Sequence, residues 1–236
     1  MQELRIRFVE RIRRTPTVKS FRFIPEEKIE FIPGQFLQLL FDPQNSQNMD
    51  LNKYLSFSSS PTKEYIEVTK RLSESMFSQR LKGLKTGDSV LIKAPLGNCV
   101  FKPEYQKTGF LIGGIGITPV ISIIEYIMNK NLSNEVLLLY SNSTQEEIAF
   151  KQELDLWKKT NKNIKIFYTL TNITEQSAEY LCGSIREEVL LDVGENWEEK
   201  TLFIFGPPGM VTCMQQLALQ VGCRKENIKT ESFIGY

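Results

Sequence analysis

Histidine is absent from this 236-residue sequence. Its absence excludes Ser-His-Asp and Cys-His nucleophilic sites, zinc sites built on histidine, and a histidine general base. Any chemistry that the protein performs must therefore depend on carboxylates, hydroxyls, backbone dipoles or a bound cofactor.

Cysteine is scarce, and its spacing predicts neither a metal site nor a redox pair. No two cysteines form a Cys-x-x-Cys motif, so an iron–sulfur cluster, a zinc knuckle and a redox disulfide are not expected. We expect these dispersed thiols to be buried and reduced, with a contact between Cys213 and Cys223 as the alternative. The four cysteines are Cys99, Cys182, Cys213 and Cys223.

The sequence also lacks an excess of charge of either sign. Its 29 Lys and Arg residues are balanced by 28 Asp and Glu residues, which leaves a formal net charge of +1. Nucleic-acid binding needs a clustered basic excess, so this function is not expected. The basic run at residues 158–165 is predicted to be a solvated helix end. Arg11, Arg13 and Arg14 are predicted to be solvated, with a docking patch for an acidic partner as the alternative.

Long hydrophobic runs are missing as well. The most apolar stretch, residues 109–128, contains four glycines, a proline and Glu125. It predicts a strand, a tight turn and a helix, and no membrane span. The charged start of the chain, residues 1–14, does not resemble a signal peptide, and we therefore expect a cytoplasmic protein.

The first part of the chain, residues 1–102, has the pattern of an antiparallel β-barrel. Short apolar bursts alternate with polar residues and are separated by turn residues. One helix is predicted, at residues 75–84. The predicted strands include residues 4–8, 18–23, 35–41, 65–72 and 89–93.

The second part, residues 103–236, has a different pattern, in which strands alternate with helices. This alternation predicts a doubly wound α/β domain with a parallel sheet. A polar, proline-containing segment at residues 102–107 marks the boundary between the two predicted domains. Strands are predicted at residues 109–112, 135–140, 164–170, 201–205 and 228–233. Helices are predicted after the glycine turn, at residues 145–159, and around Met210, Met214, Leu217, Ala218 and Val221.

The glycine-rich segment at residues 113–119 is the strongest candidate for binding a ligand. It follows a buried strand and precedes a helix, so its backbone N–H groups and the helix dipole could hold a phosphate. Thr118 is positioned to cap the helix, and Pro119 suits its first turn. The alternative is a tight strand–helix turn that binds nothing, and the spacing is not a strict Gly-x-Gly-x-x-Gly.

Three further segments contain residues suited to ligand binding. Residues 53–61 combine a lysine with several hydroxyls, and residues 205–210 form a Gly-Pro-Pro-Gly turn between a strand and a helix. Ligands bind beyond the carboxyl ends of parallel strands, so the Gly-Pro-Pro-Gly turn and the glycine segment could face the same ligand. The terminal segment, residues 230–236, carries aromatic rings that could stack on a planar ligand. Each segment has an alternative that binds no ligand. Residues 53–61 would then be a serine-rich edge strand, residues 205–210 a rigid turn, and residues 230–236 a chain end packed into the core.

In this order, these segments resemble the ferredoxin–NADP reductase superfamily of flavoprotein reductases. Lys53-Tyr-Leu-Ser56 is similar to the Arg-x-Tyr-Ser flavin motif, and residues 73–81 resemble the turn that binds the flavin diphosphate. Residues 113–119 and 206–210 are similar to the two nicotinamide-coenzyme loops. Residues 31–36 and 94–97 resemble the strand before the flavin motif and the Pro-x-Gly that closes the barrel.

The resemblance implies FAD and NAD(P)H as cofactors and assigns the residues that bind them. It implies catalytic roles for Ser56, Glu231 and Phe233, of which Glu231 could steer or relay a proton. We add Lys70 and Arg71, at the end of the strand predicted at residues 65–72. The cofactor-binding residues are Lys53, Tyr54, Leu55, Ser56, Lys70, Arg71, Ser78, Gly113, Gly114, Gly116, Thr118, Pro119, Gly206, Pro207, Met210 and Tyr236.

Three residues depart from the family pattern. Lys53 replaces an arginine, so a phosphate would meet a point charge in place of a bidentate fork. Leu55 replaces the tyrosine that lies against the flavin, and Phe205 replaces the cysteine near the nicotinamide. The turn around Ser78 favours FAD over FMN. NADH is favoured over NADPH because the segment at residues 140–147 lacks the arginine or lysine that a 2′-phosphate requires.

The resemblance therefore predicts a flavin-dependent NAD(P)H oxidoreductase. Since the chain has no redox centre of its own, electrons would pass through FAD to an external redox protein such as ferredoxin. A reductase of free flavin is the first alternative, and a non-catalytic electron-relay subunit of a larger complex is the second.

Overall fold

A computed structural model describes residues 2–175, 177–194 and 196–233. The contacts within the chain divide it into two compact units. The first contains Met1–Phe101 and Thr118–Asn129, and the second contains Lys102–Ile117 and Lys130–Tyr236. The predicted domains, 1–102 and 103–236, differ from these units at residues 118–129, and their boundaries stay a prediction.

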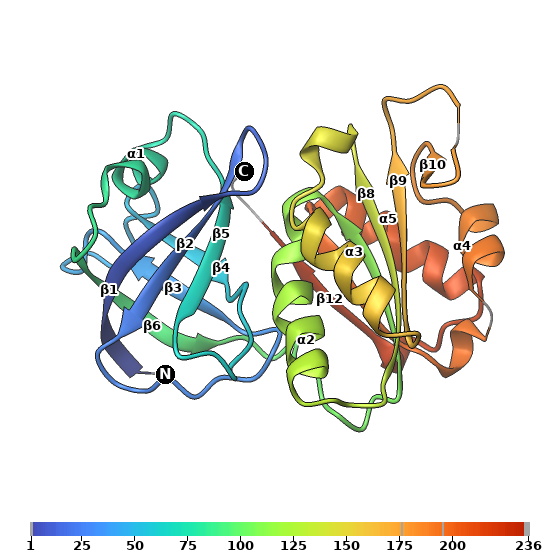
Figure 1. The fold of residues 1–236 in the computed structure, drawn as a ribbon, viewed down its shortest axis with the longest axis horizontal. Helices are drawn as coiled ribbons and strands as arrows, with labels where there is room; N and C mark the ends of the chain where they lie inside the picture. Colours follow the sequence, from blue (N-terminus) through green and yellow to red (C-terminus); the bar gives the residue numbers. More distant parts are fainter. Residues whose placement is uncertain (1, 176, 195, 234–236) are drawn as a thin grey trace. The chain divides into compact units, whose positions relative to one another are not determined.

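The first unit is built on a six-stranded antiparallel sheet, as the sequence predicts (Figure 1). Its strand order is β4-β3-β6-β1-β2-β5, and an isolated bridge between Phe57 and Val68 brings the two edges together. The sheet is therefore a nearly closed barrel. Its elements are β1 (Gln2–Arg13), β2 (Val18–Pro25), β3 (Phe36–Leu40), β4 (Asn52–Ser56), β5 (Ile66–Arg71), α1 (Met76–Gly83) and β6 (Ser89–Leu96).

The barrel core follows from the period-two alternation in the sequence. Along β1, Ile6 and Phe8 are buried, whereas Arg5 and Arg7, which alternate with them, are exposed. The side chains of one face pack with those of the other strands, and helix α1 adds Phe77 to the same cluster. The prediction of a solvated Arg14 is wrong, because its side chain is only 10% exposed and forms an ion pair with buried Glu67 at 3.1 Å. The pattern could not show this, since Glu67 comes from a strand 53 residues away.

The second unit contains a six-stranded parallel sheet with the order β10-β9-β8-β7-β11-β12. Its strands are β7 (Lys107–Gly113), β8 (Glu135–Asn142), β9 (Ile164–Leu170), β10 (Tyr180–Cys182), β11 (Thr201–Gly206) and β12 (Ile228–Ser232). The helices of the chain beyond α1 are α2 (Ile117–Asn129), α3 (Lys151–Thr160), α4 (Glu187–Val193) and α5 (Pro208–Gln220). Short 3₁₀ turns are η1 (Gly114–Gly116), η2 (Gln145–Glu147), η3 (Trp197–Glu199) and η4 (Lys225–Asn227).

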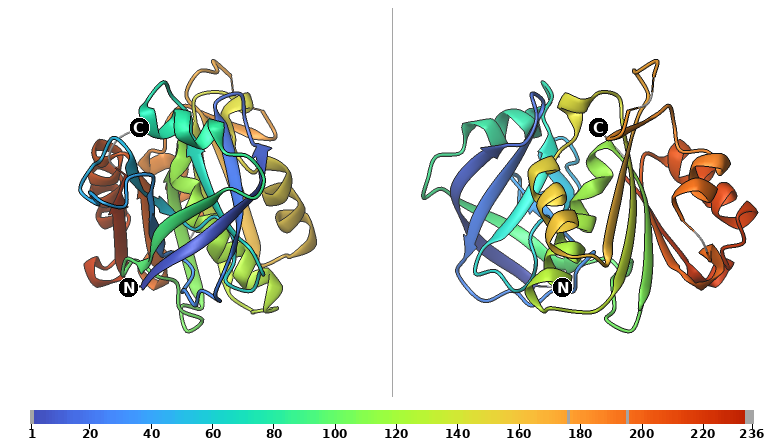
Figure 2. Two further views of the ribbon diagram at one scale, coloured as in Figure 1. Left: turned by 90° about the vertical axis from the view of Figure 1, so that its left-hand side faces the viewer. Right: turned by 45° about the vertical axis from the view of Figure 1, so that its right-hand side comes forward.

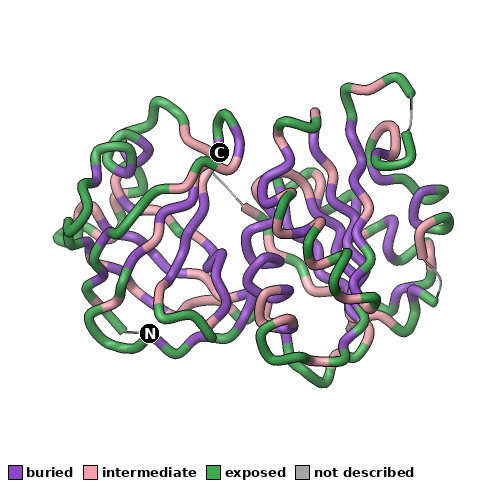
Figure 3. The backbone as a smooth tube through the Cα atoms, in the orientation of Figure 1, coloured by how far each residue is buried: buried purple, intermediate pink, exposed green. Residues whose placement is uncertain are grey.

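Helices cover both faces of this parallel sheet, so the doubly wound prediction is confirmed (Figure 2). On one face α4 and α5 pack against Leu137 and Ile204. On the other face lies α3, where Asp155 accepts a hydrogen bond from the hydroxyl of Tyr168 at 2.7 Å. The stretches of buried backbone follow the central strands of both sheets (Figure 3).

The helix predicted at residues 145–159 is wrong in its first half. The 3₁₀ turn η2 occupies Gln145–Glu147, and α3 begins only at Lys151, because Phe150 adopts a left-handed φ of +61° that interrupts a helix. β10 and α4 were not predicted from the polar sequence between β9 and β11. None of the helices in the described residues has the length and apolarity required to span a bilayer.

Candidate functional site

The turn before α1 gathers serine hydroxyls at the N-terminus of this helix. Ser75 is the N-cap, and its hydroxyl accepts a hydrogen bond from the amide of Ser78 at 3.3 Å. The hydroxyl of Ser78 is fully buried and accepts a bond from the amide of Ser73 at 3.2 Å. Helix N-termini favour anions, so this turn suits the diphosphate role predicted for residues 73–81.

Two lysines lie close enough to repel one another in the same unit. Lys70 is at the end of β5 and Lys53 is on β4, so they come from the two edge strands of the sheet. Burial lowers the pKa of Lys70, and the charge of Lys53 lowers it further. A negatively charged ligand here would relieve this repulsion, so the pair fits a diphosphate group.

The remaining residues of the predicted flavin motif lie on both faces of β4. Leu55 packs against the barrel core, whereas Tyr54 is 51% exposed and meets the ring of Phe36 edge-on at 5.8 Å. Ser56 is buried, and its hydroxyl has no hydrogen-bond partner within the described part of the chain. Arg71, at the end of β5, donates a hydrogen bond to the hydroxyl of Thr17 at 3.3 Å.

The glycine segment forms a 3₁₀ turn that runs directly into α2. Gly114 has a left-handed φ of +50°, and its carbonyl accepts a hydrogen bond from the buried hydroxyl of Tyr140 at 3.0 Å. The predicted capping role of Thr118 is wrong, because α2 already begins at Ile117, whose amide bonds to the carbonyl of Gly114. Pro119 lies in the first turn, as predicted.

The two predicted coenzyme loops lie against each other in the second unit. A β-carbon at Gly113 would lie 2.3 Å from the sulfur of Met210, and one at Gly116 would lie 2.3 Å from the carbonyl oxygen of Phe205. A β-carbon at Gly206 would lie 3.8 Å from the amide nitrogen of Gly113. Packing against the backbone of Phe205 therefore requires a glycine at Gly116, and a side chain at Gly113 would displace Met210. Pro207 is the N-cap of the helix that follows.

At the end of the sheet, Phe233 stacks on Phe205 with ring centroids 6.3 Å apart and an interplanar angle of 18°. The amide of Phe233 donates to the carbonyl of Gly206 at 2.9 Å. Glu231 pairs with Phe205 across β11 and β12, and burial raises its pKa to about 7. Phe205, at the position of the family cysteine, is thus fully buried beneath Phe233. Tyr236 lies outside the described residues.

Buried polar atoms without partners lie at the carboxyl edge of the parallel sheet. Asn142, the last residue of β8, has both its amide nitrogen and its amide oxygen buried and unpaired, and the hydroxyl of Thr169 on β9 is in the same state. Buried polar groups normally have a hydrogen-bond partner, so these atoms fit a bound polar molecule near this edge. The sequence analysis did not single out either residue.

Two residues of α2 that belong to no predicted motif hold the turn after the flavin motif. The hydroxyl of Ser122 donates to the carbonyl of Ser59 at 2.8 Å, and both residues are buried. Glu125 accepts a hydrogen bond from the amide of Ser60 at 2.7 Å and forms an ion pair with Lys63 at 3.2 Å. No sequence signal reveals these contacts, because the partners are more than 60 residues apart.

Two domain families match the chain. Residues 5–101 match the oxidoreductase FAD-binding domain, and residues 110–216 match the oxidoreductase NAD-binding domain. In its fold, the chain is similar to the flavohem-like FAD/NAD-binding domain of nitric oxide dioxygenase from Vibrio cholerae. The TM-score is 0.83 at 20% identity, with 98% of each chain covered.

Two curated relatives are similar in sequence. A flavohemoprotein from Bacillus subtilis is 27% identical over 229 residues, which are 94% of this chain and 57% of the relative. An NADH-cytochrome b5 reductase-like protein from Arabidopsis thaliana is 29% identical over 164 residues, which are 68% of this chain and 50% of the relative. The chain thus spans about half the length of these relatives.

The barrel and the doubly wound sheet, each matched by its own domain family, define a two-domain flavoprotein oxidoreductase. The chain carries an oxidoreductase FAD-binding domain followed by an oxidoreductase NAD-binding domain, and this confirms the resemblance to the ferredoxin–NADP reductase superfamily.

Proposed function

We propose that the chain transfers electrons from NADH through FAD to an external redox protein. The observation that carries the proposal is the pair of lysines, Lys53 and Lys70, beside the serine turn at α1. Two like charges on the edge strands of a barrel that matches a FAD-binding domain fit a diphosphate. The buried hydroxyl of Ser78 belongs to the same site.

The bound FAD would supply the redox chemistry, accepting a hydride from the nicotinamide and releasing its electrons to the acceptor. The side chains of this chain bind and orient. Lys53, Lys70 and Arg71 would bind the negatively charged diphosphate of FAD. The hydroxyl of Ser56 would donate a hydrogen bond to a nitrogen of the flavin ring. Glu231, whose pKa is about 7, can hold or release a proton near neutral pH. Phe233 is the ring that the nicotinamide would displace from Phe205.

For the coenzyme, we propose that the diphosphate lies on the glycine turn of the second unit. The backbone of Gly114 has a left-handed conformation and is held by Tyr140, which fixes the turn. Thr118 and Pro119 lie in the first turn of the helix that follows, and Gly206, Pro207 and Met210 form the opposing loop. The segment at residues 141–147 offers glutamates and no cation, which favours NADH over NADPH.

The acceptor that we propose is a separate redox protein or a further domain. The relatives include an NADH-cytochrome b5 reductase-like protein and a flavohemoprotein, whose names point to haem proteins as acceptors. A ferredoxin is an equivalent candidate for this family.

A reductase of free flavin is the second candidate, and the position of Leu55 favours it. Leu55 packs into the barrel core, and the neighbouring ring of Tyr54 lies on the opposite face of β4. The chain therefore offers no aromatic ring at the position where the family has one, which would weaken the hold on the flavin.

The experiment that separates these candidates measures flavin retention and turnover together. The purified chain is loaded with FAD, passed through gel filtration, and assayed with NADH and either a ferredoxin, cytochrome b5 or added riboflavin. The proposal predicts retained FAD and turnover only with a protein acceptor. Loss of FAD with turnover of riboflavin supports the free-flavin reductase. Retained FAD that NADH does not reduce supports an electron-relay subunit.

A further inference from the structure

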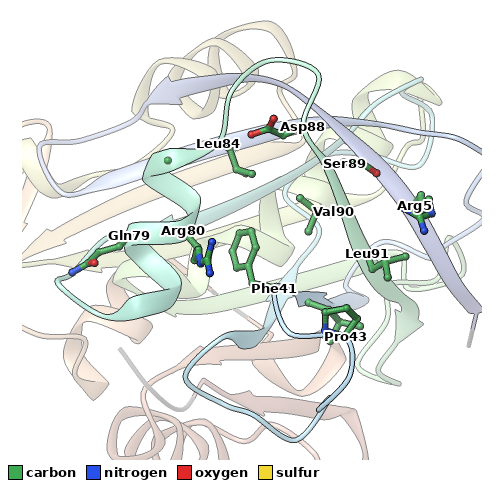
Figure 4. A pocket seen from close by; sticks show the side chains of 12 residues that line it. Arg5, Phe41, Pro43, Gln79, Arg80, Leu84, Asp88, Ser89, Val90 and Leu91 are labelled. Atoms are coloured by element: carbon green, nitrogen blue, oxygen red, sulfur yellow. The ribbon is translucent and has the colours of Figure 1, made fainter.

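The barrel carries a pocket of about 590 Å³, which is lined by none of the residues predicted individually as binding or catalytic (Figure 4). Its walls come from β1, β3, β6 and α1, and the loop after β3 adds Phe41 and Pro43. Pockets of 300–1,000 Å³ commonly hold ligands the size of a drug or metabolite. The volume is therefore large enough for a small organic molecule.

The pocket lies along α1, and one of its lining residues, Gln79, donates a hydrogen bond to the carbonyl of Glu74 in the serine turn at 3.0 Å. Lys82 and Ser78 of this helix bond to Ser73 of that turn, whereas Arg80 and Gly83 line the pocket. A molecule in this pocket would therefore meet residues of α1 other than Ser78, which is the α1 residue assigned to the proposed FAD site.

The pocket combines an apolar floor with cations on two sides. Phe41 and Val90 lie at its centre, with Leu84 and Leu91 nearby. Figure 4 shows Arg80 from α1 on one side of the Phe41 ring, and Arg5 from β1 on the other side, beside Leu91. The floor would bury the apolar body of a ligand, and the guanidinium groups would meet its charge. Arg5 lies next to Leu91 because the two residues pair across β1 and β6.

The charges in the pocket favour an anion. Among the described residues, the guanidinium groups of Arg5 and Arg80 have no hydrogen-bond or ion-pair partner. Asp88 is the only acidic residue in the described lining, and its carboxylate accepts a hydrogen bond from the amide of Lys85 at 2.8 Å. The lining thus has two guanidinium groups and a single carboxylate, which already accepts a hydrogen bond. Guanidinium groups pair well with carboxylates, so the pocket suits a ligand that carries one.

We infer that this pocket binds a small carboxylate with an apolar body, such as an arylalkyl acid. The apolar part lies over Phe41 and Val90, and the carboxylate pairs with Arg80 or Arg5. This inference goes beyond the proposed electron transfer and does not depend on it. Gln79 and Arg80 of the 73–81 segment line the pocket, but none of the residues assigned individually to FAD or the coenzyme does.

Gly83 provides a way to close the pocket without disturbing the fold. A β-carbon added at Gly83 would meet no atom within 4 Å, and the backbone there is not left-handed. Gly83 is the last residue of α1, where most side chains are more favourable than glycine. The variant Gly83→Phe should therefore fold and fill the space above Phe41.

The test measures binding of 4-phenylbutyrate to the full chain by titration calorimetry, with the neutral amide of the same acid as chemical control. We expect saturable one-to-one binding of the acid and about tenfold weaker binding of the amide, as for a charge-assisted hydrogen bond. Gly83→Phe should abolish binding of both. The double variant Arg5→Gln, Arg80→Gln should bind the acid no better than the amide.

Arg13→Gln is the matched control, because Arg13 is exposed on the same strand and does not line the pocket. It should leave the affinity for the acid unchanged. The inference is overturned by an absence of saturable acid binding, by equal affinities for acid and amide, or by a preference for the acid that survives in the double variant. Should Gly83→Phe not fold, as judged by circular dichroism, the arginine variants still decide the outcome.

Discussion

The carboxylate of Glu125 on α2 accepts a hydrogen bond of 2.7 Å from the backbone amide of Ser60. Ser60 is fully buried and lies four residues after Ser56, the serine of the predicted flavin motif. The same helix begins at Ile117, directly after the glycine turn. One helix thus follows the proposed coenzyme turn in sequence and holds the turn that ends the proposed flavin strand.

Removing this carboxylate should destabilise the barrel. In Glu125→Ala, the buried amide of Ser60 loses its acceptor, and we expect the free energy of unfolding to fall by about 1–3 kcal/mol. Glu125→Gln keeps an acceptor oxygen and loses only the ion pair with partly exposed Lys63, so it should lose less than about 1 kcal/mol. Urea unfolding measures both. Equal losses in the two variants would contradict the role of the hydrogen bond.

Lys53 and Lys70 should contribute to FAD binding through the diphosphate. We expect Lys53→Gln and Lys70→Gln each to weaken FAD about tenfold, because a charge-assisted contact is lost, and to leave riboflavin binding nearly unchanged. Lys53→Arg should tighten FAD, since a guanidinium can bind two phosphate oxygens. Fluorescence titration with the two flavins gives the affinities.

The control for this pair is Lys93→Gln on β6, which removes a lysine outside the proposed site. The proposal fails if the Lys53 and Lys70 variants weaken FAD and riboflavin equally, or if Lys93→Gln weakens FAD as much as they do.

Gly116 should tolerate no side chain. In Gly116→Ala the new β-carbon would lie 2.3 Å from the backbone oxygen of Phe205, and backbone cannot move aside cheaply. We expect a loss of about 1–3 kcal/mol in the free energy of unfolding. Gly209→Ala, on α5, is the matched variant, because its β-carbon meets nothing within 4 Å, and its stability should be equal or slightly higher. A Gly116→Ala protein as stable as the unchanged chain would contradict the close approach of Gly116 to the backbone of Phe205.

Glu231 should make stability depend on pH. Burial raises its pKa from 4.5 to about 7, so the native carboxyl stays protonated where the unfolded one is already ionised. Stability should therefore fall as pH rises from about 4.5 to about 7, by at most about 3 kcal/mol, and then level off. Glu231→Gln should lack this fall. Thermal unfolding at several pH values tests it, and parallel curves for the two proteins would contradict it.

The two folds could be predicted from local patterns. The alternation of apolar residues along β1 predicts the barrel, and the buried strands β7 and β9 predict the parallel sheet. Each pattern lies within one element, so it can be seen in the sequence. The prediction was wrong where one residue interrupts the pattern, as Phe150 does before α3.

The site could be predicted only in part, because its contacts join distant strands. The serine turn and the glycine turn are local, and their residues are visible in the sequence. The approach of Lys53 to Lys70 depends on the meeting of the two edge strands, and the bond between Glu125 and Ser60 joins residues 65 apart. Burial of Arg14 against Glu67 was missed for the same reason.

The most direct test of the proposed function mixes the FAD-loaded chain with NADH, and separately with NADPH, in the absence of oxygen, and follows the visible absorption of the flavin. The proposal predicts that FAD stays bound through purification and that NADH bleaches it faster than NADPH does. A bound flavin that stays oxidised with both coenzymes would contradict hydride transfer in this protein.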